Sequence, residues 1–301
     1  MILPRLALVA LLAASVPPGD AALAVRAGTE WRTWWRAADA PVRWSGALPE
    51  LAGAVAWRPA AAGVEWGELQ LAGAGEAYRT RVIVARIDPA RVAFRLALPS
   101  ANGGWAGRWS IDEAPAEAIL ALNAGQFTAG PWGWLVLDGV ERQPPGRGPL
   151  APGVVLDPSG QLRLVDADSL ATARGALPTL AFQSYPTLLE RDGDVPRALR
   201  DPSLGVNLQH RDARVALGEL RDGRVLVAVT RFDGLGGALD ALPFGLTTPE
   251  MAAVMGGLGA RRAVLLDGGI SGQLLLRDGD RTHAWPGLRK VALGLLVLPR
   301  R

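Results

Sequence analysis

Short apolar runs, many of them alternating with polar residues and broken by glycine, proline or aspartate turns, fill most of this sequence. Clear examples are Glu65–Leu71, Arg79–Ile87 and Arg91–Leu98. Alternation with a period of two residues places every second side chain on one face of a β-strand. We therefore expect these runs to form consecutive antiparallel strands.

Two segments carry helix signals instead. Thr247–Gly256 opens with Thr247 and Glu250 at the spacing of a capping box, and Pro249 stands near the first helical position. Ser110–Ala118 has a cap residue and acids in its first turn, which predicts a short helix. Many strands with few helices predict an α+β fold, built on a large mixed, mostly antiparallel sheet.

The first 24 residues have the pattern of a secretory signal peptide. Arg5 precedes the apolar run Leu6–Ala14, and small residues follow. We expect cleavage after Ala22 or Ala24. The alternative is a retained membrane anchor, but the apolar run is shorter than the ~20 residues that a bilayer requires.

Cysteine is absent from the sequence. Disulfides, a thiolate nucleophile and a cysteine metal site are therefore excluded. Export without cysteines is typical of a bacterial periplasmic or secreted protein, and this is the location we expect.

Tryptophan is concentrated near the start of the expected mature chain, with six of the 11 tryptophans between Glu30 and Trp66. These rings could form an aromatic platform for sugars, or they could pack a wrapping segment onto the core. The second interpretation is favoured. It divides the chain into a tryptophan-rich segment at 25–79, packed on a main domain at 80–301.

Charge and histidine content exclude several functions. The formal net charge is +3, and the arginines alternate with acids, so no basic run is present to follow a nucleic-acid backbone. The only histidines, His210 and His283, lie in polar loops, which argues against a Ser-His-Asp triad and excludes a multi-histidine metal site. We expect no organic cofactor, while a carboxylate site for Ca²⁺ or Mg²⁺ stays open.

The strongest local candidate for chemistry is Asp267. It follows the apolar run Ala263–Leu266 and precedes Gly268 and Gly269. A carboxylate at the end of a buried strand lies where open sheets bind ligands, and glycine amides can approach an anion. The alternative is a tight turn with a turn-stabilising aspartate.

Two other strand ends show related features. Asn123 follows the apolar run 119–122 and is followed closely by Gly125. Arg214 begins the strand Arg214–Gly218 and could grip a phosphate through two N–H groups. The alternative for Arg214 is a solvated arginine at a strand edge.

Taken in order, these motifs resemble the phosphodiester glycosidase family over roughly residues 80–298. The segments that carry the resemblance are Leu122–Phe127, Phe182–Leu189, Arg214–Gly218, Phe232–Gly234, the helix after Gly245, and Leu265–Ser271. The sequence departs from the family pattern at Val215, which replaces a hydroxyl residue, at Ile270, which replaces a third glycine, and at Gly272, which replaces a serine.

The resemblance implies an exported hydrolase that cleaves a glycosyl phosphodiester or related glycoside of the cell envelope. Asp267 and Asp233 would be the catalytic carboxylates, and their separation would indicate retention or inversion at the sugar. The residues expected to bind the carbohydrate or sugar-phosphate substrate are Arg214, Gly268 and Gly269 at the phosphate, Asn123 at a sugar hydroxyl, and Gly125, Ser271, Gln183 and Ser184 around them. Because Ile270 is bulky, the alternative is a non-catalytic protein that binds glycans or assists polysaccharide export.

Overall fold

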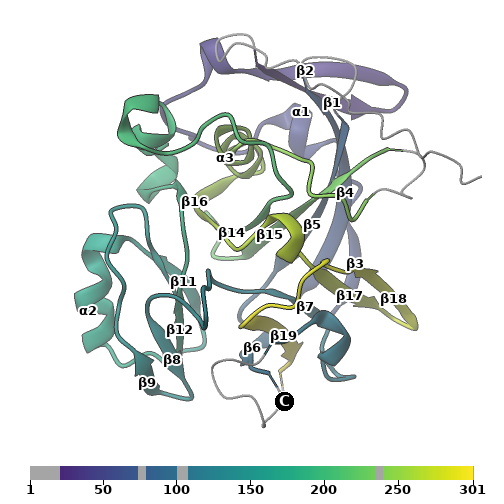
Figure 1. The fold of residues 1–301 in the computed structure, drawn as a ribbon. Helices are drawn as coiled ribbons and strands as arrows, with labels where there is room; N and C mark the ends of the chain where they lie inside the picture. Colours follow the sequence, from purple (N-terminus) through teal and green to yellow (C-terminus); the bar gives the residue numbers. More distant parts are fainter. Residues whose placement is uncertain (1–20, 74–78, 100–107, 235–239, 301) are drawn as a thin grey trace, which may run out of the picture.

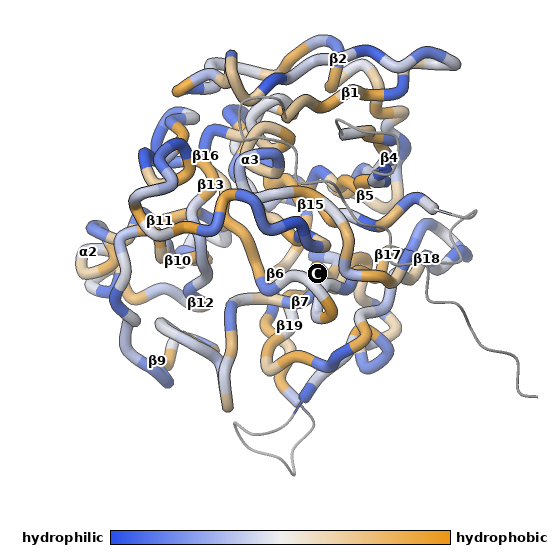
Figure 2. The backbone as a smooth tube through the Cα atoms, turned by 45° about the horizontal axis from the view of Figure 1, so that its top comes forward, coloured by the Kyte–Doolittle hydropathy of each residue, from blue (hydrophilic) through white to orange (hydrophobic). Residues whose placement is uncertain are grey.

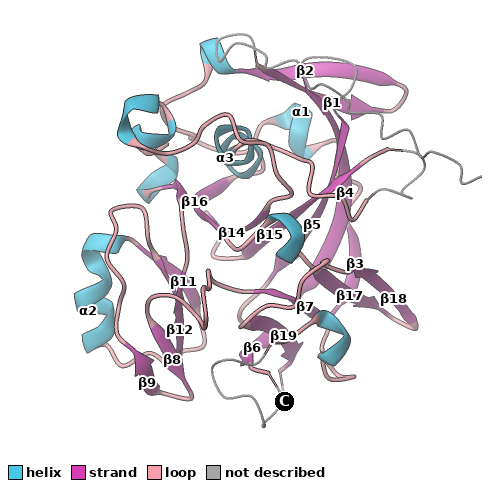
Figure 3. Ribbon diagram, in the orientation of Figure 1, coloured by secondary structure: helices cyan, strands magenta, loops and turns pink. Residues whose placement is uncertain are grey.

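The computed structural model describes residues 21–73, 79–99, 108–234 and 240–300. Every strand pair among these residues is antiparallel, and helices are few and short (Figure 3). The expected mostly antiparallel α+β fold is therefore confirmed. The strands divide among three sheets, however, instead of forming one large sheet.

The largest sheet has nine strands and contains both β14 and β16, which border the candidate site. Its order is β13 (Thr187–Leu189), β16 (Ala260–Leu265), β14 (Val215–Leu220), β15 (Val225–Phe232), β5 (Arg79–Ile87), β4 (Val64–Gly73), β1 (Ala22–Ala27) and β2 (Glu30–Arg36), with β3 (Arg58–Ala61) paired to β4.

The other two sheets have five strands each. One has the order β11 (Leu162–Val165), β10 (Gly153–Leu156), β12 (Leu180–Gln183), β8 (Leu135–Leu137) and β9 (Val140–Gln143). The other has the order β18 (Arg281–Trp285), β17 (Leu274–Asp278), β7 (Leu120–Asn123), β19 (Gly294–Pro299) and β6 (Val92–Ala97). The strands predicted at Glu65–Leu71, Arg79–Ile87 and Arg91–Leu98 were expected to be neighbours. β4 and β5 do pair, but β6 pairs with β19 in a different sheet. Alternation fixes which face of a strand is buried but leaves its partner open.

The α-helices are α1 (Pro49–Ala52), α2 (Leu170–Gly175) and α3 (Thr248–Gly257). The capping box of Thr247 and Glu250 is present in α3, as predicted. The helix expected at Ser110–Ala118 is wrong in extent, because only a 3-10 turn at Ile111–Glu113 forms. Pro115 has no N–H to continue a helical hydrogen-bond ladder, so the turn stops there.

The nine-stranded sheet curls around α3 (Figure 1). Buried side chains of α3 join a core with residues of β1, β4, β5, β13, β14 and β16. The opposite face of the sheet packs on the two smaller sheets through a second core. Hydrophilic residues gather mainly along the outer turns and loops (Figure 2). The site described below therefore rests on a rigid, two-sided frame.

The tryptophan-rich segment supplies β1 to β4 of the main sheet. Trp35, Trp44 and Trp66 are buried, and a Cβ at Gly256 would lie 2.2 Å from Cγ of Trp44. These contacts support core packing rather than a sugar platform for these three rings. Most of the expected leader lies outside the described residues, but its end forms the start of β1, where Leu23 is fully buried.

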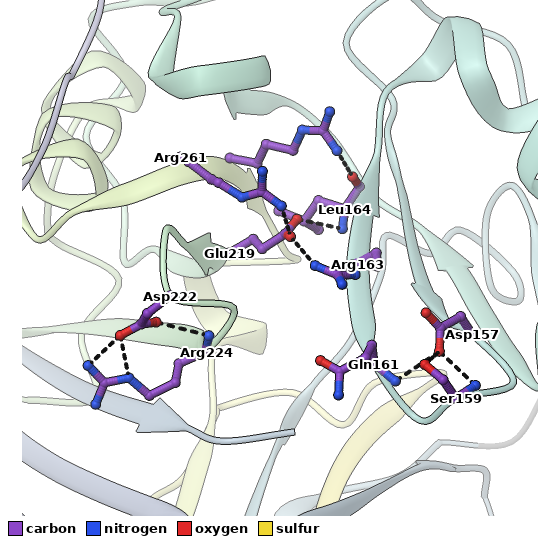
Figure 4. A network of polar contacts seen from close by, with 10 residues as sticks. Asp157, Ser159, Gln161, Arg163, Leu164, Glu219, Asp222, Arg224 and Arg261 are labelled. Atoms are coloured by element: carbon purple, nitrogen blue, oxygen red, sulfur yellow. Dashed lines mark hydrogen bonds and ion pairs between the residues drawn. The ribbon is translucent and has the colours of Figure 1, made fainter. Parts of the chain in front are cut away.

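A buried ion-pair cluster connects the small sheet that contains β11 to the large sheet (Figure 4). The carboxylate of Glu219 on β14 accepts hydrogen bonds from Arg163 on β11 and from Arg261 on β16. Its side chain is almost fully buried, so losing either arginine would leave a poorly compensated charge.

No helix among the described residues is long and apolar enough to cross a membrane.

Candidate active site

The three sheets meet at the end of β16. Leu266 donates its backbone N–H to the carbonyl of Val215, and Ser184 donates its hydroxyl to the carbonyl of Leu265 at 2.6 Å. Asn123, the last residue of β7, donates its side-chain amide to the carbonyl of Asp267. Segments far apart in the sequence thus converge on Asp267, as the order of motifs implied.

The glycines after Asp267 allow close packing of the turn on the chain beside it. A Cβ at Gly268 would lie 2.4 Å from the carbonyl oxygen of Ala213, and Gly269 has φ of +58°. The N–H of Gly269 donates to the carbonyl of Ala213 at 2.7 Å. This amide is thus engaged within the protein, and the role expected for it at a substrate phosphate is replaced by a role in packing.

Asn123 holds the Asp267 turn at both ends. Besides donating to the carbonyl of Asp267, its side-chain oxygen accepts the N–H of Gln273 at 3.0 Å. Asn123 is fully buried. Its side-chain amide therefore positions the turn from inside the protein, and the expected contact with a sugar hydroxyl is replaced by this structural role. Gly125 next to it adopts φ of +41° and packs on the carbonyl of Gln183, where a Cβ would be 3.0 Å away.

A buried arginine supports the far side of the same turn. Arg231 on β15 donates to the carbonyls of Gly272 and Trp285 at 2.9 and 2.6 Å. Burial lowers the pKa of Arg231 to about 10. Together, Arg231 and Asn123 fix the backbone that carries Asp267.

The Asp267 carboxylate is held by Ser271 and Arg289. Nη2 of Arg289 lies 3.3 Å from Oδ2 of Asp267. The Ser271 hydroxyl oxygen accepts from Nε and Nη2 of Arg289 at 2.9 and 2.6 Å, so its own proton is directed to Asp267, with which it is also hydrogen-bonded.

Burial is the main cause that raises the pKa of Asp267 above its ordinary value. The hydrogen bond from Ser271 and the charge of Arg289 act in the opposite direction, and the negative charge of Asp212 raises the pKa further. The side chain of Asp267 is 17% exposed, so a substrate can still reach it. Its carboxylate is thus partly desolvated and still reachable, and its protonated form is more favoured than that of an aspartate in water.

Asp212 and His210 are functional candidates that the sequence did not reveal. Asp212 precedes β14, and its Oδ1 accepts the N–H of Ala213 at 2.9 Å. Nε2 of His210 lies 3.6 Å from Oδ2 of Asp212. No local pattern marks Asp212, because it follows no apolar strand and stands in a polar loop between two arginines.

Arginines line the same cleft. Arg214 donates from Nε to the carbonyl of Leu246 at 2.8 Å and from Nη2 to the carbonyl of His210 at 2.6 Å. Arg289, which the sequence also did not reveal, is 48% exposed and lies with its guanidinium carbon 4.8 Å from the ring centre of Phe127. Arg214 therefore holds two loops together at the cleft. Arg289 is exposed to the solvent in the cleft and also contacts Asp267.

These residues surround a cleft of about 1120 Å³. Of the predicted site residues, Arg214, Asp267, Gly268 and Gly269 line it. The charged side chains among its described lining residues are Arg147, Arg211, Arg214 and Arg289 against Asp212 and Asp267. The cleft is thus suited to an anionic ligand, with two carboxylates placed among the cations.

Three predicted residues, Gln183, Ser184 and Asp233, do not line the cleft. Gln183 is fully buried and bonds with its side chain to the backbone of Trp134, Gly146 and Ala151. Ser184 is likewise buried and bound to β16. Asp233, whose backbone N–H donates to the carbonyl of Arg79, is not among the residues that line the cleft. Gln183 and Ser184, which the resemblance placed around the substrate, instead anchor loops through buried hydrogen bonds.

Among the residues that the structure describes, no group of three or more His, Asp or Glu side chains could hold a metal ion.

Comparison with known proteins agrees with this fold. The sequence model of the phosphodiester glycosidase family matches residues 116–298, a range that includes Asn123, Arg214, Asp267 and Arg289. A search of curated protein sequences found no match.

Two solved structures resemble the chain. The catalytic domain of zebrafish N-acetylglucosamine-1-phosphodiester alpha-N-acetylglucosaminidase, auto-inhibited by its pro-peptide, aligns with a TM-score of 0.58 at 14% identity, over 82% of this chain and 87% of that one. A hypothetical protein from Synechocystis aligns with a TM-score of 0.51 at 17% identity, over 79% of this chain and 62% of that one. At these identities the likeness establishes a shared fold.

Proposed function

Because the chain belongs to the phosphodiester glycosidase family, we propose that it hydrolyses a glycosyl phosphodiester, with Asp267 at the scissile bond and Arg289 at the phosphate. One observation carries the assignment. The partly buried carboxylate of Asp267 lies 3.3 Å from the half-exposed guanidinium of Arg289, in a cleft with an excess of arginines. A phosphodiester places an anion and a cleavable glycosidic oxygen side by side, which matches this pair.

Arg289 couples phosphate binding to the protonation of Asp267. In the free protein its charge lowers the pKa of Asp267, against the effect of burial. A bound phosphate competes with Asp267 for the same guanidinium, because Arg289 favours paired phosphate oxygens. Binding of the phosphate therefore raises the pKa of Asp267 and favours the protonated carboxyl.

The protonated Asp267 then donates to the departing oxygen. The bond between C1 of the sugar and the phosphate oxygen breaks, and its electron pair leaves with the phosphate monoester. Positive charge develops on the ring oxygen and C1, as in other glycoside hydrolyses. Since phosphate is already a good leaving group, this proton transfer contributes less than it would with an alcohol.

The location follows from the sequence pattern at residues 1–24. We place the protein outside the cytoplasm, in the periplasm or secreted, with a sugar-phosphate of the cell envelope as its substrate class. Support comes from the leader pattern and from the absence of cysteine.

Ile270 favours a second candidate function. Its side chain is 41% exposed and lines the cleft beside Asp267. A branched apolar group there narrows the approach to the carboxylate. A protein that binds glycans or assists polysaccharide export without catalysis would tolerate that restriction.

Hydrolysis of aryl phosphodiesters of common sugars in ¹⁸O-labelled water tests the proposal. Wild-type protein should release the aryl phosphate, and the label should appear on C1 of the sugar. Asp267→Asn should lower kcat, but by less than the roughly 10²–10⁴-fold typical of a general acid, because phosphate is a good leaving group. Asp280→Asn, an exposed aspartate in the turn between β17 and β18, should match the wild type. Label in the phosphate would indicate P–O cleavage instead. Binding of a sugar phosphate without any turnover would support the second candidate.

A further inference from the structure

Asp212 lies directly against the turn that carries Asp267. If Gly269 had a Cβ, that atom would be 2.8 Å from Oδ2 and 3.1 Å from Oδ1 of Asp212. Gly269 is two residues after Asp267, and both aspartates line one cleft. The negative charge of Asp212 also contributes to the raised pKa of Asp267. The two carboxylates are thus close enough to interact.

The surroundings of Asp212 leave it open to water. Its side chain is 24% exposed, and Oδ1 accepts one backbone N–H at 2.9 Å. Arg211, its neighbour, donates two hydrogen bonds of 2.6 and 2.8 Å to the carboxylate of Glu250 on α3. Nε2 of His210 lies 3.6 Å from Oδ2 of Asp212.

We propose that Asp212 is the second carboxylate of the reaction and the base that activates the attacking water. The inference rests on the proposed hydrolysis and assigns to Asp212 the part that the sequence had suggested for Asp233. Glycoside hydrolases of the inverting type need such a base, separated from the acid by enough room for one water. Asp212 and Asp267 both line the cleft, whose volume is about 1120 Å³.

The step balances as follows. One O–H proton of the water moves to a carboxylate oxygen of Asp212, and the oxygen forms the new bond to C1. The bond from C1 to the phosphate oxygen breaks, and the phosphate monoester leaves with that electron pair and the proton of Asp267. Asp212 afterwards releases its proton to solvent, and Asp267 takes one up. Direct displacement by water inverts the configuration at C1.

Replacement of the base with a small residue leaves room for an external nucleophile. In Asp212→Ala, kcat should fall by about 10²–10⁴-fold, and sodium azide should restore turnover, with a glycosyl azide as the product. Asp267→Asn should show no azide rescue, because this variant lacks the proton donor to the leaving phosphate, which azide does not replace. Asp280→Ala serves as the matched control and should keep wild-type kinetics. Thermal unfolding of each variant establishes that it is folded.

The outcomes separate the two levels of the proposal. Azide rescue of Asp212→Ala, with inversion at C1 followed by NMR in the wild type, supports Asp212 as the base. Unchanged kcat in Asp212→Ala, failure of azide to rescue a folded variant, or retention at C1 would overturn the inference, while loss of activity in Asp267→Asn would leave the proposed function standing. If the wild type hydrolyses no glycosyl phosphodiester, the proposed function itself fails.

Discussion

The carboxylate of Asp212 lies against the backbone of Gly269, with Oδ2 only 2.8 Å from the position that a Cβ would take. Gly269, the second glycine after Asp267, therefore does more than form a turn. It lets the loop before β14 approach the end of β16 and places a second carboxylate beside the first. Because this contact requires that residue 269 has no side chain, substitution of Gly269 tests it.

Gly269→Ala should reduce both stability and activity. A residue with φ of +58° and a Cβ is strained by about 1–2 kcal/mol, and the new methyl group would displace Asp212. Gly279→Ala is the matched control, since Gly279 has the same φ of +58° with nothing within 4 Å of its Cβ position. Both variants should lose similar stability in denaturant titrations, but only Gly269→Ala should lose turnover. Equal activity in the two would show that the position of Asp212 is unimportant.

Asp267→Asn should be more stable than the wild type at neutral pH. Because the pKa of Asp267 is raised in the folded protein, folding favours the protonated form, and the ionised form costs stability as the pH rises through the folded pKa. The difference should shrink on acidification and vanish below the ordinary value of 3.8. Thermal unfolding from pH 3 to pH 8 measures it. A variant less stable than the wild type at neutral pH would mean that the paired carboxylate is stabilising.

Arg289→Gln should weaken binding of the phosphate. A hydrogen bond to a charged group is worth about 1.5–3 kcal/mol, so KM for an aryl phosphodiester should rise roughly 10–100-fold, and inhibition by inorganic phosphate should weaken in parallel. Loss of the Arg289 charge also removes an influence that lowers the pKa of Asp267, so the pH profile should shift upward. Arg142→Gln, an exposed arginine on β9, is the control. Unchanged phosphate inhibition would place the anion elsewhere.

Local signals predicted the elements with strong internal patterns. The capping box of Thr247 and Glu250 and the apolar run before Asp267 depend on residues close in sequence, and both appear as expected in α3 and β16. Helix capping and strand alternation are local interactions, so a single sequence carries them. The distribution of strands among three sheets could not be predicted in the same way, since β6 and β19 are chosen as partners by the packing of the whole core.

The site shows the same division. The sequence predicts Asn123, Arg214 and Asp267 as parts of one site and assigns Asn123 to the substrate. In the structure the side-chain amide of Asn123 is bound to the Asp267 turn instead. The resemblance at Phe232–Gly234 predicts Asp233 as the second carboxylate. In the structure the cleft is lined by Asp212 instead.

The sequence by itself determined that this chain would form a mostly antiparallel α+β fold with Asp267 at the end of a buried strand, because periodicity and strand-end chemistry are written in consecutive residues. Only the tertiary structure decided which side chains accompany Asp267. Arg289 and Asp212 meet it from loops 22 and 55 residues away along the chain (289 minus 267 and 267 minus 212). Their meeting depends on the antiparallel pairing of β14 with β16 and on the close packing at Gly269, which local sequence does not encode.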